Sequence, residues 1–209
     1  MEKILNYLKA PFWVFFAILL AFIVWETCKY QFVPRRWGVV TEGKIYRSGR
    51  IAPHLMRAAL QKHGIKVIVD LTDSDLENSS VRSEQKAAEE LGITRHHFEL
   101  CGDGTGSITN YALAIAAIAR AAGENKPVLV HCAAGVQRTG GVIAAYRLLV
   151  EKQLPATAYA ELTRYGWKAR SDRALLDYLN ANMAALAALL REMRVIGNAR
   201  GAPPPLNAP

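Results

Sequence analysis

A short apolar strand that runs directly into a glycine-containing loop and then a helix limits the fold of this chain most strongly. Residues 127–131 read Pro-Val-Leu-Val-His, which has the length and β-branched content of a strand buried on both faces. Helical spacing begins again at Thr139 and continues to Lys152. Buried strands that alternate with helices are typical of an α/β domain, in which helices cover a sheet.

The rest of the chain continues this alternation. We expect an entry strand and turn within 38–50, strands at 65–71 and 94–100, and helices at 51–62, 83–91, 108–122, 157–165 and 171–194. A loop with three glycines lies between the second of these strands and the next helix, at residues 101–107. The sequence therefore predicts a central, mostly parallel sheet flanked by helices.

The N-terminal segment is of a different kind. Residues 10–25 are uncharged and almost entirely apolar, with no polar face. A helix that is hydrophobic all round belongs in a membrane or deep in a core. Sixteen helical residues reach about 24 Å, somewhat less than the ~30 Å hydrocarbon core, and Thr27 and Cys28 extend the helix. We therefore expect a single transmembrane helix at about 10–28, within an anchor segment 1–33.

Two other interpretations of this segment are open, a cleaved signal peptide and a buried core helix. The signal peptide is disfavoured because no small-x-small cleavage site follows the apolar run. Basic residues are slightly more numerous after the run than before it: Lys29, Arg35, Arg36 and Lys44 against Lys3 and Lys9. By the positive-inside rule, the downstream part of a single-pass membrane protein is then cytoplasmic.

Composition limits the partners. The net charge of +8 suits phosphorylated substrates and anionic lipid headgroups, and no concentrated basic run argues for nucleic acid. The three cysteines contain no Cys-x-x-Cys pair, so neither a zinc site nor a disulfide scaffold is expected. Residues 34–197 form the predicted main domain, and the Pro- and Ala-rich segment 198–209 is predicted to be disordered.

The residues after the buried strand read His131-Cys132-Ala133-Ala134-Gly135-Val136-Gln137-Arg138-Thr139-Gly140. A loop between a strand end and a helix start aims successive backbone N–H groups into one concavity, which the helix dipole makes an anion site. Gly135 allows the tight turn. Arg138 offers a planar fork for two oxygens of one oxyanion. In such a field a cysteine pKa falls from about 8.5 to about 3.5–7.5, so Cys132 is a candidate thiolate.

This stretch resembles the signature loop of the cysteine-dependent protein tyrosine phosphatases, and every fixed position of that pattern is present. The segments Tyr46-Arg47-Ser48-Gly49 and Gly64–Leu71 are similar to the opening of the compact, atypical dual-specificity phosphatases. The resemblance extends over about 38–178 and implies that 34–197 is a phosphatase catalytic domain. If Cys132 were only a buried structural residue, the presence of Gly135, Arg138, Thr139 and Gly140 at their pattern positions would be a coincidence.

The resemblance implies a two-step reaction through a phosphocysteine on Cys132, in which residues Ala133, Ala134, Gly135, Val136, Gln137 and Arg138 bind the phosphate. It implies that Thr139 hydrogen-bonds the sulfur and that His131 orders the loop and helps to set the thiol pKa. In the family, the general acid lies about thirty residues before the cysteine, which corresponds to Asp103. Asp103 as a turn residue is the alternative, with Asp73 and Asp75 as other candidate acids. No metal or other cofactor is required.

The substrate class remains open between two kinds of phosphate ester. The five residues between Cys132 and Arg138 carry no charge, which favours phosphotyrosine, phosphoserine and phosphothreonine in proteins over polyphosphorylated lipids. The expected membrane anchor favours a phosphoinositide or phosphoglycerolipid. Two alternatives of other classes are a phosphate-binding module with little turnover and a sulfur-transfer enzyme, although the Arg138-Thr139-Gly140 ending does not suit the latter.

Overall fold

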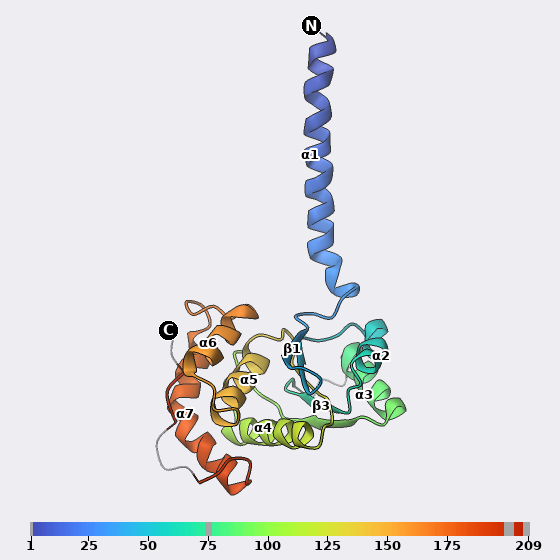
Figure 1. Cartoon of the computed structure of the whole chain (residues 1–209). Coiled ribbons are helices and arrows are strands. Elements are labelled where there is room, and N and C mark those ends of the chain that lie inside the picture. The colour runs from blue at the N-terminus through green and yellow to red at the C-terminus, as the bar shows by residue number, and fades with distance from the viewer. Residues whose placement is uncertain (1, 74–76, 199–202, 207–209) are drawn as a thin grey trace. The chain divides into compact units, whose positions relative to one another are not determined.

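The computed structural model describes residues 2–73, 77–198 and 203–206, and for residues 2–12 it describes the backbone alone. Contacts within the chain divide it into two units, Met1–Val33 and Pro34–Pro209. Each unit has its own organisation. The first is helical, and the second is an α/β domain (Figure 1).

The first unit consists of the α-helix α1 (Glu2–Cys28) and the 3₁₀-helix η1 (Lys29–Gln31). Its segment Trp13–Gln31 has a mean hydropathy of 1.6, and none of it is buried. It is long and apolar enough to cross a membrane, and an N-terminal signal sequence has the same features. The helix begins well before Ala10, since the flanking Lys3 and Lys9 are themselves good helix formers.

The second unit contains a five-stranded sheet with the strands β1 (Gly38–Thr41), β2 (Ile45–Ser48), β3 (Val67–Asp70), β4 (Thr94–His97) and β5 (Val128–His131). Their order across the sheet is β1-β2-β5-β3-β4. β1 pairs antiparallel with β2, and the other three pairings are parallel. The expected mostly parallel sheet is therefore confirmed, with one antiparallel strand added by a hairpin that replaces the single expected entry strand.

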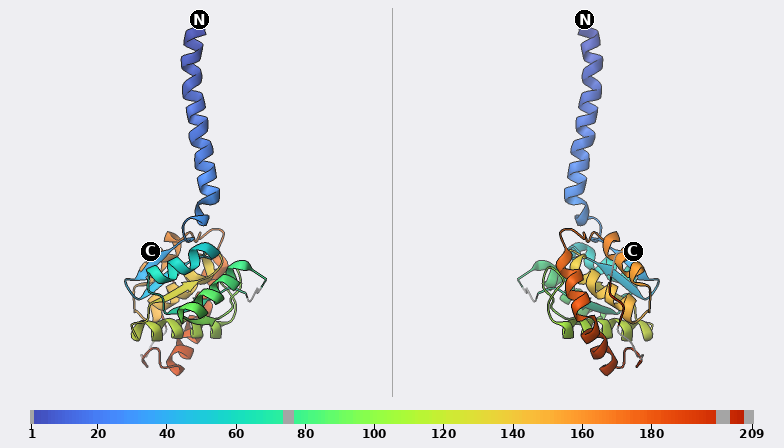
Figure 2. Two further views of the ribbon diagram at one scale, coloured as in Figure 1. Left: turned by 90° about the vertical axis from the view of Figure 1, so that its right-hand side faces the viewer. Right: turned by 90° about the vertical axis from the view of Figure 1, so that its left-hand side faces the viewer.

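Helices cover both faces of this sheet (Figures 1 and 2). They are α2 (Pro53–Lys62), α3 (Ser79–Leu91), α4 (Ile108–Gly123), α5 (Gln137–Leu149), α6 (Pro155–Arg164) and α7 (Arg173–Glu192). On one face, Ile68 and Leu129 pack with apolar residues of α2 and α3. On the other, their strand neighbours Val67, Val69 and Val130 pack with α4, α5, α6 and α7. Successive side chains of a strand point to opposite faces of the sheet, so helices on both faces bury β3 and β5 on both sides.

Two of the departures from the sequence expectations have an identifiable side-chain cause. Helix α3 begins at Ser79, four residues early, because the side chain of Asn78 caps it by accepting a hydrogen bond from Ser80 N (3.0 Å). Within the tail that was expected to be disordered, Leu206 is fully buried in the main core. Its N–H donates to Asn180 Oδ1 (2.7 Å), and its carbonyl accepts from Asn180 Nδ2 (3.2 Å). This paired amide contact, which composition does not reveal, holds residues 203–206 against α7.

Candidate active site

The loop that carries the cysteine lies at the carboxyl edge of the sheet. Strand β5, at the centre of the sheet, ends at His131, Cys132 follows it, and α5 begins at Gln137. No side chain caps the start of α5. The carboxyl ends of parallel strands are the usual position for ligand sites in α/β folds. An uncapped helix start there leaves N–H groups available to an anion.

Hydrogen bonds from outside hold the loop backbone in one orientation. Three consecutive carbonyl oxygens each accept one: Ala133 O from Arg50 N (3.0 Å), Ala134 O from Arg36 Nη1 (3.0 Å) and Gly135 O from Arg47 Nη2 (2.8 Å). A carbonyl and the following N–H point in opposite directions in a trans peptide. With the carbonyls held outward, the next N–H groups face the other side, and Gly135 N indeed donates to Cys132 Sγ (3.2 Å). The loop is thus a preformed anion cradle.

Gly135 is required here for two reasons. Its φ is +72°, which disfavours residues with a Cβ. A Cβ on Gly135 would also lie 2.6 Å from Gly49 N and 2.8 Å from Ser48 C, at the end of β2. The loop therefore packs directly on the backbone after β2, which explains why the segment Tyr46–Gly49 is part of the same pattern.

The Cys132 thiol is 2% exposed, and burial alone would disfavour its charged form. The hydroxyl and amide of Thr139 act in the opposite direction, as do the Arg138 guanidinium and the Gly135 amide. These effects prevail, so the pKa of the Cys132 thiol lies below its ordinary value. A buried sulfur whose thiolate is stabilised by hydrogen bonds and a neighbouring cation has the properties that a nucleophile needs.

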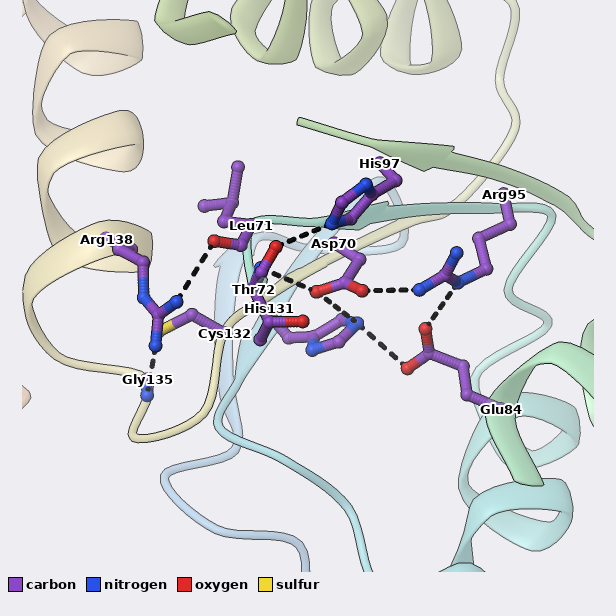
Figure 3. A network of polar contacts seen from close by, with 10 residues as sticks. All are labelled: Asp70, Leu71, Thr72, Glu84, Arg95, His97, His131, Cys132, Gly135 and Arg138. Carbon is purple, nitrogen blue, oxygen red and sulfur yellow. Dashed lines mark hydrogen bonds and ion pairs between the residues drawn. The ribbon is translucent and has the colours of Figure 1, made fainter. Parts of the chain in front are cut away.

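Arg138 is nearly buried, and its guanidinium lies beside the cysteine (Figure 3). Its Nη1 makes long hydrogen bonds to Leu71 O (3.4 Å) and Leu100 O (3.5 Å). Its Nε has no hydrogen-bond partner among the described residues. The two carbonyls orient the fork, and the remaining donors are available to an oxyanion.

Asp103 lies on the loop 101–107, which packs against the start of α5. A Cβ on Gly104 would come within 3.2 Å of the backbone of Gln137, and Tyr111 Oη donates to Gly104 O (2.5 Å). The Asp103 carboxylate is turned to its own loop, where Oδ1 accepts from Thr105 N (2.9 Å) and Thr105 Oγ1 (2.7 Å). These bonds lower the pKa of Asp103. The loop is beside the phosphate cradle, while the carboxylate has the turn geometry that was the alternative.

The structure describes one of the two other candidate general acids. Asp73 is exposed, three residues after the end of β3, and Asp75 lies outside the described residues.

The sequence did not predict which residues support the loop through hydrogen bonds and ion pairs. Arg47 is fully buried, pairs with Glu161 through Nη1 and Oε1 (3.2 Å), and stacks on the Tyr165 ring at 3.8 Å. Glu161 also pairs with Arg147 on α5 (2.5 Å). In the sequence, Arg47 was notable only as part of the segment Tyr46–Gly49, and the spacing of more than one hundred residues between Arg47 and Glu161 gives no sequence signal for their contact.

His131 lies within a second buried network on the other side of the sheet (Figure 3). Its Nε2 is 2.8 Å from Glu84 Oε2 and 3.9 Å from Asp70 Oδ1. Arg95 pairs with both of these carboxylates. The three groups His131, Glu84 and Asp70 are close enough to hold a metal ion, but Arg95 pairs with one oxygen of each carboxylate and makes the cluster a network of ion pairs.

The chain is similar to known phosphatases in sequence and in fold. The family model described as "Polymorphic toxin system, DSP-PTPase phosphatase" matches residues 43–152, just over half of the chain. The dual specificity protein phosphatase OPG106 of vaccinia virus (strain Copenhagen) is 39% identical over 64 residues, 30% of this chain and 37% of that protein. The match to the Western Reserve protein spans 34% of it, so this chain matches only about a third of the length of these curated relatives.

Solved structures show the same fold. TpbA of P. aeruginosa superimposes with a TM-score of 0.58 at 21% identity, covering 75% of this chain and 91% of TpbA. The catalytic domain of the PP-IP phosphatase SIW14 from S. cerevisiae gives 0.57 at 20% identity, covering 78% and 96%. The resemblance to cysteine-dependent, atypical dual-specificity phosphatases is thereby confirmed, and the chain belongs to the DSP-PTPase phosphatase family.

Proposed function

We propose that the chain hydrolyses phosphomonoesters in proteins through a phosphocysteine on Cys132, with phosphotyrosine, phosphoserine and phosphothreonine as substrates. The observation that carries this proposal is the sulfur with a lowered pKa at the focus of the cradle of amides, beside the partly unpaired guanidinium of Arg138. A phosphatase of this superfamily needs these groups and little other chemistry, because phosphoryl transfer depends on positioning and charge stabilisation.

The two steps balance with the residues of this chain. In the first, the Cys132 thiolate forms an S–P bond, the ester P–O bond breaks, and the leaving oxygen takes a proton from Asp103, whose carboxyl would have to leave its bonds to Thr105 to reach it. In the second, water forms a new P–O bond, the S–P bond breaks, and the Asp103 carboxylate receives the proton of the water. Arg138 and the amides of 133–138 hold the equatorial oxygens, and the Thr139 hydroxyl stabilises the departing sulfur.

The proposed substrate class follows from the loop side chains. Residues 133–137 carry no charge, so within the loop itself Arg138 supplies the one cation, which suits a single phosphate group. The vaccinia relative is named a dual specificity protein phosphatase, and one TpbA structure contains phosphotyrosine. Both facts support a single phosphomonoester on a protein side chain.

A membrane lipid phosphate is the second candidate, and one observation favours it. None of the segment Trp13–Gln31 is buried, and its composition is apolar, as that of a membrane span would be. A single-pass anchor with a cytoplasmic catalytic domain would bring the cradle to substrates at a membrane surface. The phosphate-binding module without turnover has less support, because the thiol and the guanidinium are both in place.

A substrate panel on the full chain in detergent separates these candidates. We expect phosphotyrosine peptides to give the highest kcat/KM, followed by phosphoserine and phosphothreonine peptides, with phosphoinositides and phosphatidylglycerophosphate in mixed micelles at least about tenfold lower. Released phosphate is the readout for every substrate. A higher kcat/KM for either lipid would make the lipid phosphatase the better-supported candidate. If no substrate of the panel released phosphate, the phosphate-binding module without turnover would be the remaining candidate.

Asp103 gives a separate prediction. Asp103→Asn is expected to lower kcat/KM for phenyl phosphate by about 10²-fold or more, because the poor leaving group needs a proton in the first step. The loss for p-nitrophenyl phosphate should be much smaller, since its leaving group is stable without one. Asp73→Asn is the matched control. If the leaving-group dependence appears in Asp73→Asn and not in Asp103→Asn, the acid is Asp73.

A further inference from the structure

The His131 network is unusual because four charged groups share one largely dry site. Asp70, Glu84 and His131 are 1%, 4% and 6% exposed, and the Arg95 side chain is 18% exposed. Arg95 Nε lies 2.8 Å from Glu84 Oε1, and Arg95 Nη2 pairs with Asp70 Oδ2. Burying a charge costs several kcal/mol unless it is paired, so two carboxylates here require two cations. Arg95 is one of them, and the His131 ring is the other.

The charges that face His131 come from each neighbouring element. They are Glu84 on α3, Asp70 on β3, Arg95 on β4 behind the two carboxylates, and Cys132 next in the chain. Burial acts to lower the pKa of His131, but Glu84 and then Asp70 outweigh it, and the pKa rises to about 9. The ring is therefore an imidazolium at neutral pH.

The orientation of the His131–Glu84 ion pair affects the charge state of the Cys132 sulfur. Figure 3 shows the His131 ring between Cys132 and Glu84, so the ion pair turns its positive end toward the thiol and its negative end away. A dipole with this direction favours the thiolate. The same network also reaches the phosphate clamp, because Asp70 Oδ1 accepts from Thr72 N (2.9 Å), and Leu71 O between them accepts from Arg138 Nη1.

We propose that Glu84 is a positioning residue of the active site, which keeps His131 protonated and thereby keeps Cys132 in its thiolate form. Glu84 lies 48 residues before Cys132, on a helix outside the signature loop. The proposal rests on the proposed function, in which Cys132 is the nucleophile. It adds a residue that touches neither substrate nor sulfur.

Glu84→Gln tests the proposal because it removes the charge and keeps the shape. Without the Glu84 charge, His131 loses its proton at lower pH, and the thiolate loses the neighbouring cation. The pH midpoint of Cys132 alkylation by iodoacetamide should rise by about one unit, which is a tenfold slower reaction below the midpoint. Peptide mass spectrometry follows Cys132 separately from Cys28 and Cys101 and needs no phosphatase activity. The acid limb of kcat/KM should move by the same amount, with little change in rate at high pH.

Two further variants distinguish charge from structure. Glu89→Gln, an exposed glutamate on the same helix, should leave the midpoint where it is in the unmodified chain. Arg95→Gln removes a cation from the network, so His131 should stay protonated to higher pH and the midpoint should not rise. A purely structural network predicts that Glu84→Gln and Arg95→Gln shift the midpoint upward alike, and that result would overturn the proposal.

A direct titration covers the case in which Glu84→Gln does not fold. In the unmodified chain, NMR of ring-labelled histidine should show His131 protonated at pH 8, and a neutral ring at pH 7 would refute the proposal. The outcomes for the proposed function are separate. Phosphatase activity that survives loss of the Cys132 thiol would remove the nucleophile assignment, while the alkylation midpoint would still decide the role of Glu84.

Discussion

Cys132→Ser should lower kcat for p-nitrophenyl phosphate by on the order of 10⁴-fold or more, as the loss of an enzyme nucleophile does. The serine hydroxyl has almost the size of the thiol, but it remains protonated at neutral pH, and the interactions that lower the thiol pKa cannot ionise it. The amides and Arg138 stay in place, so substrate binding should persist. The measurement is kcat and KM on the full chain in detergent, with phosphate release as the readout.

The matched control for this variant is Cys28→Ser, which changes an exposed cysteine of α1. It should retain full activity. The melting temperature of Cys132→Ser should stay within a few degrees of the unmodified chain, which separates loss of chemistry from loss of fold. Full activity in Cys132→Ser would contradict the phosphocysteine mechanism altogether.

Arg138→Lys is expected to lower kcat/KM by about 10³-fold. Lysine keeps the positive charge but replaces the planar fork with a point charge, which cannot hold two oxygens of the transferring phosphoryl group in parallel. It also cannot reproduce both contacts of Arg138 Nη1, to Leu71 O and Leu100 O. Because the thiolate loses part of its stabilisation, the acid limb of the pH profile should also move to higher pH.

Arg120→Lys, at an exposed arginine of α4, is the control with the same chemical change. It should be indistinguishable from the unmodified chain. Inorganic phosphate or vanadate inhibition adds a second readout, since Arg138→Lys should weaken both inhibitors strongly. A variant that kept normal inhibition and normal kcat/KM would show that Arg138 is not the phosphate clamp.

Local patterns made the fold class predictable. The apolar, β-branched runs that became β3 and β5 are buried on both faces, and such strands occur in sheets that helices cover. Boundaries were less predictable where one side chain decided them, as with the Asn78 cap of α3. The sequence did not predict the β1–β2 hairpin, although Gly43, with a φ of +69°, lies in its turn.

The candidate site likewise has features that the sequence predicted and features that only the structure revealed. The spacing from Cys132 to Arg138 and Thr139 is a local property, because a strand end, a tight loop and a helix start fit within these few residues. The orientation of the Asp103 carboxylate is also local, because it bonds to Thr105 two residues on, but the sequence left it open between a turn residue and a general acid. The arginines that hold the loop carbonyls, Arg36 and Arg47, lie 98 and 88 residues from their partners.

The amino-acid sequence alone determined the loop from Cys132 to Arg138, the α/β class and the apolar N-terminal helix, because each depends on the order of neighbouring residues. Only the tertiary structure decided which charges surround that loop. Glu84, Asp70 and Arg95 come from three separate elements, and they meet His131 because the strand order brings β3 between β4 and β5. Electrostatic interactions in a buried site depend on distances in space and on desolvation, and neither is written in sequence spacing.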